Sequence, residues 1–145
     1  MGLDTAFNMA ETAKIIYQGA LRTQATHLGS GNQLITDAPL DNNGKGEAFS
    51  PTDLVATALG SCMLTMMGIK ARSMDFDLED ASVSVTKIMA SAPRRIAEIK
   101  VHLRLKQNCD DHTRKVLEET ALHCPVSKSL SRELKQSVSF EWVQE

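Results

Sequence analysis

Two cysteines stand in unlike sequence settings, and their chemistry depends on whether they meet in the fold. Cys62 lies inside an apolar run, residues 54–69, that reads as a buried helix. Cys124 precedes Pro125 in the segment His-Cys-Pro-Val-Ser, where one helix is expected to end and another to begin. A thiol within a buried helix and a thiol at a helix start differ in reactivity. If the two face each other, the chain carries a dithiol redox pair.

Cys62 has two interpretations. Free cysteine is among the most buried residue types, so Cys62 fits as a small core side chain whose pKa is raised and which is inert. A reactive Cys62 needs a nearby cation that favours its thiolate. Arg22 and Arg72 are candidates by type, whereas Lys70 and Lys128 are weaker because only a guanidinium can also hold a second acidic group in a bidentate way.

Cys124 also has two interpretations. If Pro125 is the first residue of a helix, Cys124 is its N-cap, and the positive end of the helix dipole favours a thiolate there. The alternative is an ordinary cap or core position. Cys109 sits in a polar loop after an expected strand and is interpreted as a bystander.

A metal site is the main rival for these side chains. Cys62, Cys124, His123 and His27 could in principle supply four ligands. The sequence has no CxxC, HxxH or HExxH spacing, and His123 cannot easily reach the ion that its neighbour Cys124 would bind. We therefore expect neither a metal nor a cofactor.

Composition narrows the class of protein. The 145 residues fit one domain, residues 1–145, with a workable core. The net charge of −2 gives no electrostatic reason to expect nucleic acid or an anionic membrane as a partner, and the 4% aromatic content argues against base stacking. Asp53 and Lys70 close off the 16-residue uncharged run, which is shorter than the roughly 20 residues that a membrane span needs.

The cysteine count indicates a compartment. Residues 1–14 lack a basic segment followed by an apolar core, so no signal peptide is expected. Three cysteines, an odd number, argue against a structural disulfide framework. We expect a cytoplasmic protein whose thiols stay reduced unless they are catalytic.

The elements that must position these thiols follow from periodicity and turn residues. Ser50 reads as an N-cap, Pro51 as the first helical residue, and Asp53 as an acid in the first turn. The expected order is a strand region at 11–28 with a turn or bulge near Gly19, a strand at 33–37, a loop at 38–49, a helix at 50–73, a hairpin of 81–90 and 95–106, a helix at 110–122, a short helix at 125–134 and a strand at 137–143. This order predicts an α+β fold.

Two motifs resemble a known family. Residues 50–62, Ser-Pro-Thr-Asp-Leu-Val-Ala-Thr-Ala-Leu-Gly-Ser-Cys, resemble the helix-start motif of the OsmC/Ohr family of osmotically inducible and organic hydroperoxide resistance proteins. Residues 124–127 resemble its second motif, Cys-Pro-x-Ser. The resemblance extends over about residues 14–142. Cys-Pro-Val-Ser replaces the Cys-Pro-Tyr-Ser of the Ohr type, and Thr26-His27 with residues 36–39 (Thr-Asp-Ala-Pro) looks more like the broader OsmC-like branch.

This resemblance implies a fold and an activity. The fold would be OsmC-like, with antiparallel sheets wrapped around two central helices in an intertwined homodimer and active sites at the subunit interface. The activity would be reduction of small organic hydroperoxides in oxidative stress defence. Cys62 would be the peroxidatic thiolate, Cys124 the resolving thiol, and a dithiol the reductant.

The resemblance also implies an arginine network around the reactive thiolate. Arg22 matches the family arginine, which a glutamate after the helix-start proline normally orients. Here that position is Thr52, followed by Asp53, while Glu47 lies upstream in the loop. Either Asp53 or Glu47 orients Arg22, or the network is absent.

Two other functions remain open. The first is a non-catalytic dimer that binds an apolar ligand or senses oxidants through the same thiols, which the missing glutamate and the methionine-rich helix favour. The second is a purely structural role in which both thiols are buried and unreactive.

Overall fold

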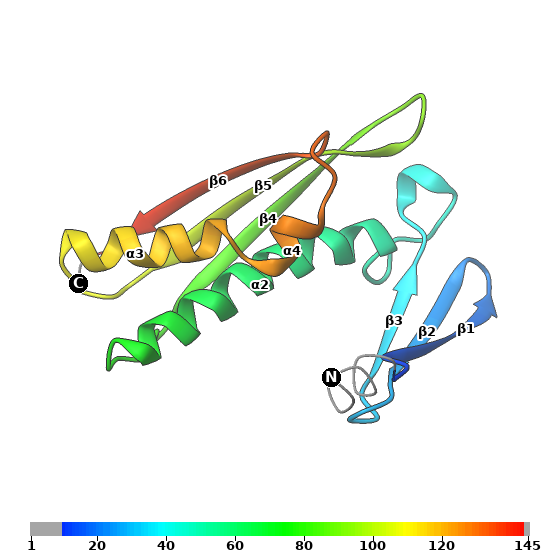
Figure 1. The fold of residues 1–145 in the computed structure, drawn as a ribbon. Coiled ribbons are helices and arrows are strands. Elements are labelled where there is room, and N and C mark those ends of the chain that lie inside the picture. Colours follow the sequence, from blue (N-terminus) through cyan, green and yellow to red (C-terminus); the bar gives the residue numbers. More distant parts are fainter. Residues whose placement is uncertain (1–9, 144–145) are drawn as a thin grey trace. The chain divides into compact units, whose positions relative to one another are not determined.

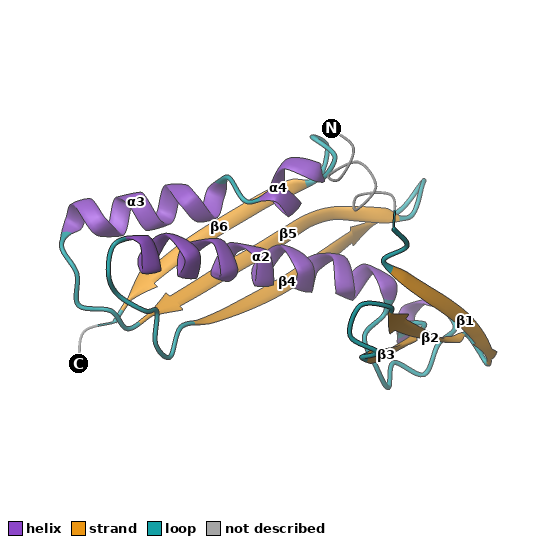
Figure 2. Ribbon diagram, turned by 60° about the horizontal axis from the view of Figure 1, so that its bottom comes forward, coloured by secondary structure: helices purple, strands orange, loops and turns teal. Residues whose placement is uncertain are grey.

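The computed structural model describes residues 10–143, so expectations for residues 1–9 and 144–145 lie outside the described part. The chain forms two compact units, Met1–Pro51 and Thr52–Glu145, and each is described by itself. The elements do not alternate strictly along the chain, Figure 2 shows helices and strands of the second unit in separate layers, and the predicted α+β class is confirmed.

The first unit is a small antiparallel sheet. Its strands β1 (Ala13–Gly19), β2 (Arg22–His27) and β3 (Gln33–Asp37) follow chain order, and a short 3-10 turn, η1 (Leu40–Asn42), comes after them (Figure 1). The predicted strand region 11–28 divides at Gly19, where the β1–β2 register shifts. Ala20 and Leu21 in the turn both have positive φ, as primed hairpin turns require.

The second unit places helices on one face of a three-stranded sheet. The sheet order is β4 (Ser82–Ala90), β5 (Arg95–Leu105) and β6 (Lys135–Trp142). Figures 1 and 2 show α2 (Pro51–Ser73) and α3 (Asp111–Leu122) on the same side of this sheet, with the short α4 (Pro125–Ser129) beyond α3. The predicted long helix, hairpin and α3 helix are all confirmed.

The sheet of the second unit is mixed, whereas the resemblance implied antiparallel sheets. β4 and β5 pair antiparallel, but β6 pairs with β5 in parallel, from Glu98 opposite Lys135 to Leu105 opposite Trp142. The reason lies in the connection, because α3 and α4 together carry the chain back along the sheet before β6 begins. A crossover of this length is what parallel neighbours need.

The core of the second unit lies between α2 and the sheet. The helix contributes a stripe of buried residues at helical spacing, and β5 contributes alternate side chains; these are Ala56, Leu59, Gly60, Met63, Met67 and Ala71, with Ile99, Val101, Leu103 and Leu105. Gly60 marks the closest approach, since a Cβ there would lie 2.8 Å from Val85 Cγ1. Helix and strand therefore meet only because this position has no side chain.

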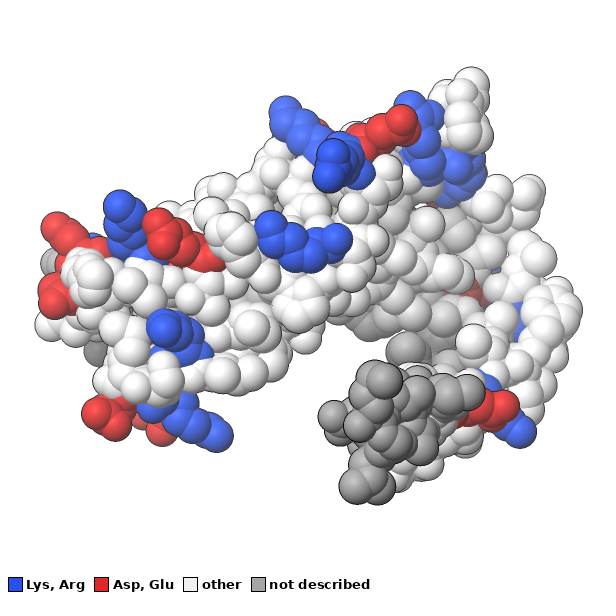
Figure 3. Space-filling model, viewed as in Figure 1, with Lys and Arg blue, Asp and Glu red and all other residues white. Residues whose placement is uncertain are grey.

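The opposite face of α2 is not covered by its own chain. Ala58, Ser61, Thr65 and Ile69 are exposed, and Figure 3 shows the surface over the middle of this helix without charged side chains. The apolarity of the helix on nearly all sides predicted a central position, and within one chain only one side is packed. By length and composition alone α2 could cross a membrane, but its sheet-facing stripe gives it a packing partner within this chain.

One helix is shorter than predicted. The sequence allows either Asp110 or Asp111 to cap α3, and the structure selects Asp110, whose side chain accepts a hydrogen bond from the Thr113 amide. The short helix after Cys124 was expected to reach about residue 134 but ends at Ser129, because Leu130 has extended backbone angles. The following residues make a turn that aligns the chain with β6.

Candidate active site

Cys62 is placed by α2. The helix begins at Pro51, as its local sequence predicts, and Cys62 lies in the fourth turn beside the buried stripe. Its side chain is half-buried and packs against the core cluster, next to Met63. The thiol is therefore neither sealed in the core nor fully in solvent.

Cys124 is placed by the start of α4. It is the N-cap residue, with Pro125 at the first helical position, and its Sγ accepts a hydrogen bond from the Ser127 amide at 3.4 Å. Cys124 is 0% exposed, in contrast to half-buried Cys62. The N-cap prediction is confirmed.

The two thiols are neighbours within the second unit, where Cys62 packs against the core cluster that includes Cys124 and affects its pKa. Burial raises the pKa of Cys124 above its ordinary value, the Ser127 amide opposes that rise, and the adjacent Cys62 raises the pKa further. Cys124 therefore holds its proton more tightly than a solvent-exposed thiol does. A protonated thiol beside a second, more accessible sulfur is an arrangement that can form a disulfide.

Two of the other proposed cations, Arg72 and Lys70, lie on α2 itself and away from Cys62. Arg72 lies ten residues further along α2, about 15 Å at 1.5 Å per residue, and pairs with Asp77 at 3.6 Å. Lys70 lies eight residues along, about 12 Å away. Neither can contact the Cys62 thiol from the same straight helix.

The first unit gathers a charged cluster around Arg22. The residue stands opposite Asp37 across the β2–β3 ladder, and its Nη2 donates to Asp37 Oδ2 at 3.2 Å and to Glu47 Oε2 at 3.5 Å. The Glu47 amide also donates to Asp37 Oδ2, at 3.0 Å. Asp37 is 1% exposed, and Arg22 and Glu47 are more open.

The protonation of this cluster follows from its contacts. The Glu47 amide lowers the pKa of Asp37 below its usual value, and Arg22 lowers it further, although burial opposes both. The hydrogen bond and the charge of Asp37 raise the pKa of Arg22 in return. The cluster is therefore an ionised, partly buried arginine clamp.

Asp53 and Thr52 have a different partner. Lys87 on β4 donates its Nζ to Thr52 Oγ1 at 2.8 Å and pairs with Asp53 Oδ1 at 2.9 Å. The side chain of Lys87 is only 15% exposed, so it ties the first turn of α2 to the sheet. Of the two acids considered for Arg22, Glu47 contacts it and Asp53 is engaged by Lys87.

No cluster of three or more metal-ligating side chains occurs among residues 10–143. The His27 ring bonds the Ser30 hydroxyl at 2.6 Å, and His123 Nδ1 donates to the Glu119 carbonyl at 2.7 Å. Cys109 is half-buried in its loop and forms no disulfide. The four residues considered as a metal site thus have other partners or form the thiol pair.

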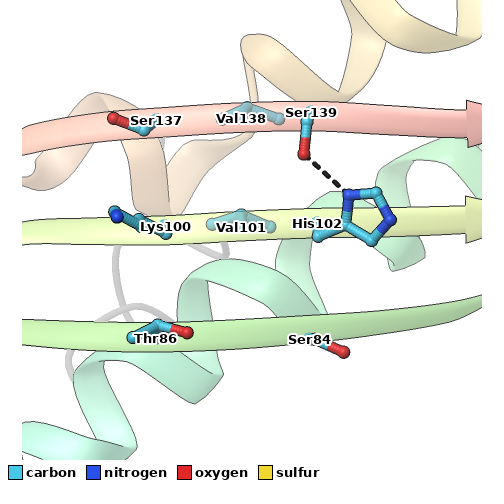
Figure 4. A pocket seen from close by; sticks show the side chains of 8 residues that line it. All are labelled: Ser84, Thr86, Lys100, Val101, His102, Ser137, Val138 and Ser139. Carbon is cyan, nitrogen blue, oxygen red and sulfur yellow. Dashed lines mark hydrogen bonds between the residues drawn. The ribbon is translucent and has the colours of Figure 1, made fainter.

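A polar trough lies on the far side of the sheet from the helices. Figure 4 shows it along β4, β5 and β6, where short hydroxyl side chains flank Lys100 and His102, and Ser139 bonds His102 at 2.7 Å. Its volume is about 430 Å³. Because β5 alternates, these residues point away from Val101 and the core, so the trough does not include the thiols.

Sequence reasoning missed three residues of these networks. Asp37 was treated only as a strand end, although counting the hairpin register would have placed it opposite Arg22. Lys87 alternates within a strand and shows no local sign of its contact with α2. Gln136, which bonds Ser127, lies before the predicted start of its strand.

The fold and the two motifs match a known family. A family model for OsmC-like proteins matches residues 44–139, which is more than half of the sequence. The chain therefore belongs to the OsmC family. Among curated proteins, none matches this chain.

Solved structures agree with this assignment. A protein of Psychrobacter arcticus 273-4, named for osmotic stress induction and a detoxification response, is 53% identical, with a TM-score of 0.87 and coverage of 91% of this chain and 96% of that one. An organic hydroperoxide resistance protein OsmC from Legionella pneumophila is 18% identical (TM-score 0.72, coverage 90% and 97%). A related hydroperoxide resistance protein of Vibrio cholerae, with captopril in one of its active sites, is 17% identical (TM-score 0.70, coverage 92% and 94%). The last two show likeness of fold alone.

Proposed function

We propose that this protein is a thiol peroxidase that reduces organic hydroperoxides through Cys62 and Cys124. The observation that carries the proposal is the contact between half-buried Cys62 and the buried, helix-capping thiol of Cys124. Relatives of the same fold named for organic hydroperoxide resistance support the substrate class. The dithiol reductant follows from the need to reopen a disulfide.

The first half-reaction oxidises Cys62. Its thiolate attacks one oxygen of the hydroperoxide, an S–O bond forms, the O–O bond breaks, and the alkoxide takes a proton and leaves as alcohol. Cys62 is left as a sulfenic acid. Cys124 stays protonated because its pKa is raised, so its S–H can donate a hydrogen bond to the neighbouring Cys62 thiolate.

The second half-reaction restores the reduced protein. The Cys124 sulfur attacks the sulfenic sulfur, an S–S bond forms, the S–O bond breaks, and water leaves with the Cys124 proton. A dithiol then reduces this disulfide by exchange and becomes oxidised itself. As the family resemblance implies, we propose Arg22 as the cation that favours the Cys62 thiolate; Asp37 and Glu47 hold its guanidinium. Asp53 instead stabilises the start of α2 with Lys87.

The test is the intact mass of the reduced protein before and after one equivalent of cumene hydroperoxide, with peptide mapping. We expect loss of two hydrogens and a Cys62–Cys124 crosslink. With dithiothreitol present, turnover should vanish in Cys62→Ser. Cys124→Ser should complete one turnover and then accumulate sulfenic or sulfinic acid at Cys62.

Cys109→Ser is the matched control, because Cys109 is the third free cysteine and lies outside the thiol pair. It should keep full turnover. Two free thiols after peroxide treatment, or an active Cys62→Ser protein, would contradict the peroxidase. A disulfide that forms once without turnover would favour the oxidant-sensing alternative.

We also propose that the protein works as a cytoplasmic homodimer. Neighbouring apolar side chains on β1 are exposed in one chain, with Ile15 at 66%, Ile16 at 69% and Tyr17 at 63%, and Ile69 on α2 is 60% exposed. Exposed apolar patches of this kind mark interaction surfaces. Light scattering should give the mass of two chains, and a monomer would contradict this assembly.

A further inference from the structure

A glutamine on β6 is bound to the turn that carries Cys124. The Ser127 hydroxyl donates to Gln136 Oε1 at 2.6 Å, and Gln136 Nε2 donates to the Ser127 carbonyl at 3.2 Å. The oxygen and the nitrogen of the Gln136 side-chain amide therefore both bond to Ser127, in a partly buried setting. Gln136 pairs with Ile99 in the parallel β5–β6 ladder, so its backbone is anchored in the sheet.

The turn needs such an anchor. α4 has five residues, and helices this short gain little stability from their own hydrogen bonds. Its opening turn has one backbone bond to Cys124, from the Lys128 amide at 3.1 Å. Ser127 is also the residue whose amide donates to Cys124 Sγ. A side chain that fixes Ser127 therefore fixes the donor that orients the thiol.

We propose that Gln136 is a positioning residue for the resolving step, which holds the Cys124 turn so that its sulfur faces Cys62. This inference rests on the proposed peroxidase chemistry. The step concerned forms the S–S bond, breaks the S–O bond of the Cys62 sulfenic acid and releases water. Gln136 does not touch the reacting sulfurs, so it acts only through Ser127.

A loss of Gln136 contacts should therefore affect the two half-reactions differently. In Gln136→Met, which keeps a side chain of similar length without the amide, oxidation of Cys62 by cumene hydroperoxide should stay within about twofold of wild type. Disulfide closure should slow about tenfold, as expected for the loss of one or two hydrogen bonds. At excess peroxide, more Cys62 should be oxidised to sulfinic acid in this variant than in wild type, because the Cys62 sulfenic acid has a longer lifetime.

Two further variants sharpen the test. Gln136→Glu keeps an acceptor for the Ser127 hydroxyl and loses the amide donor, so its closure rate should lie between those of wild type and Gln136→Met. Gln107→Met is the matched control, because Gln107 also donates its amide to a backbone carbonyl of this unit, that of Glu79 at 3.0 Å. It should close its disulfide at the wild-type rate.

Rapid-mixing mass spectrometry measures the sulfenic, disulfide and sulfinic forms, and thermal melts show that each variant folds. Closure driven by diamide, a thiol oxidant that needs no peroxidase activity, is followed in parallel. If cumene hydroperoxide does not oxidise the wild-type protein, the proposed function is refuted. The rate of disulfide formation with diamide still decides the role of Gln136 in that case. Wild-type closure rates with both oxidants in folded Gln136→Met would overturn the inference.

Discussion

Asp37 in the first unit and Cys124 in the second are buried to the same degree, at 1% and 0% exposure, yet their pKa values move in opposite directions. Asp37 receives an amide hydrogen bond and faces a guanidinium, and these contacts outweigh its burial. Cys124 also receives an amide hydrogen bond, from Ser127, but its burial outweighs that bond and the neighbouring Cys62 raises its pKa further. Burial alone therefore does not decide whether a buried acid is ionised, because its hydrogen-bond partners and the nearby charges also set its pKa.

This contrast assigns different tasks to the two regions. The arginine clamp of Arg22, Asp37 and Glu47 stays ionised and holds a positive charge in a defined place. The thiol pair keeps Cys124 protonated beside a more accessible sulfur. The proposed peroxidase chemistry would use both: a fixed cation for the nucleophile and a neutral thiol for the resolving step.

The largest expected effect tests the cation. An opposite charge shifts the ionisation of a neighbouring group by roughly ten- to a thousand-fold, so Arg22→Met should slow Cys62 oxidation by cumene hydroperoxide about a hundredfold. Arg22→Lys should lose less, although an ammonium cannot span two carboxylates as a guanidinium does. The measurement is the second-order rate constant of sulfenic acid formation.

The control for this prediction is Arg104→Met. Arg104 pairs with Glu141 at 3.6 Å on the far side of the sheet from the helices, and its loss should leave the rate unchanged. If Arg22→Met and Arg104→Met oxidise Cys62 at the same rate, Arg22 does not assist the oxidation of Cys62.

A second prediction concerns the helix that carries Cys62. An alanine Cβ at Gly60 would lie 2.8 Å from Val85, so Gly60→Ala should lower the free energy of unfolding by about 1–3 kcal/mol. Gly68→Ala meets nothing within 4 Å and should raise it by up to about 1 kcal/mol. Urea unfolding of both variants measures the difference. A destabilised Gly68→Ala protein would mean that a further surface packs on this part of α2.

The smallest expected effect is the acid stability of the clamp. Because the pKa of Asp37 is lowered in the folded protein, its contribution is present above the ordinary carboxyl pKa of about 4 and is lost as the pH falls through the lowered value. Asp37→Asn should flatten the pH dependence of the unfolding midpoint between about pH 2 and 5. Glu47→Gln should change it less, since Glu47 is 62% exposed. Equal curves for wild type and Asp37→Asn would contradict the assignment.

Local sequence explains which parts of the site could be predicted. Pro51 and Pro125 mark helix starts through their own backbone preferences, so the settings of Cys62 and Cys124 were visible without a structure. The start of α3 was left to either Asp110 or Asp111, because an aspartate side chain can accept a hydrogen bond from an amide of the first helical turn. Each of these features depends on residues within one turn of the chain.

The remaining features depend on contacts between distant segments. Lys87 reaches Thr52 across 35 positions, and nothing in its own strand indicates that contact. The end of α4 at Ser129 and the parallel direction of β6 depend on where β5 lies, not on local helix preference. Gln136 likewise acquires its role only when β6 lies beside the Cys124 turn.

The contact between Cys62 and Cys124 joins positions that lie 62 residues apart in the sequence. A bond between them closes a loop of that length in the unfolded chain, and the lost chain entropy corresponds to about 4 kcal/mol of stabilisation at room temperature. In the proposed catalytic cycle, the protein would be less stable to unfolding in its dithiol form and more stable in its disulfide form. Redox chemistry at the two thiols would then also switch the folding stability of the chain.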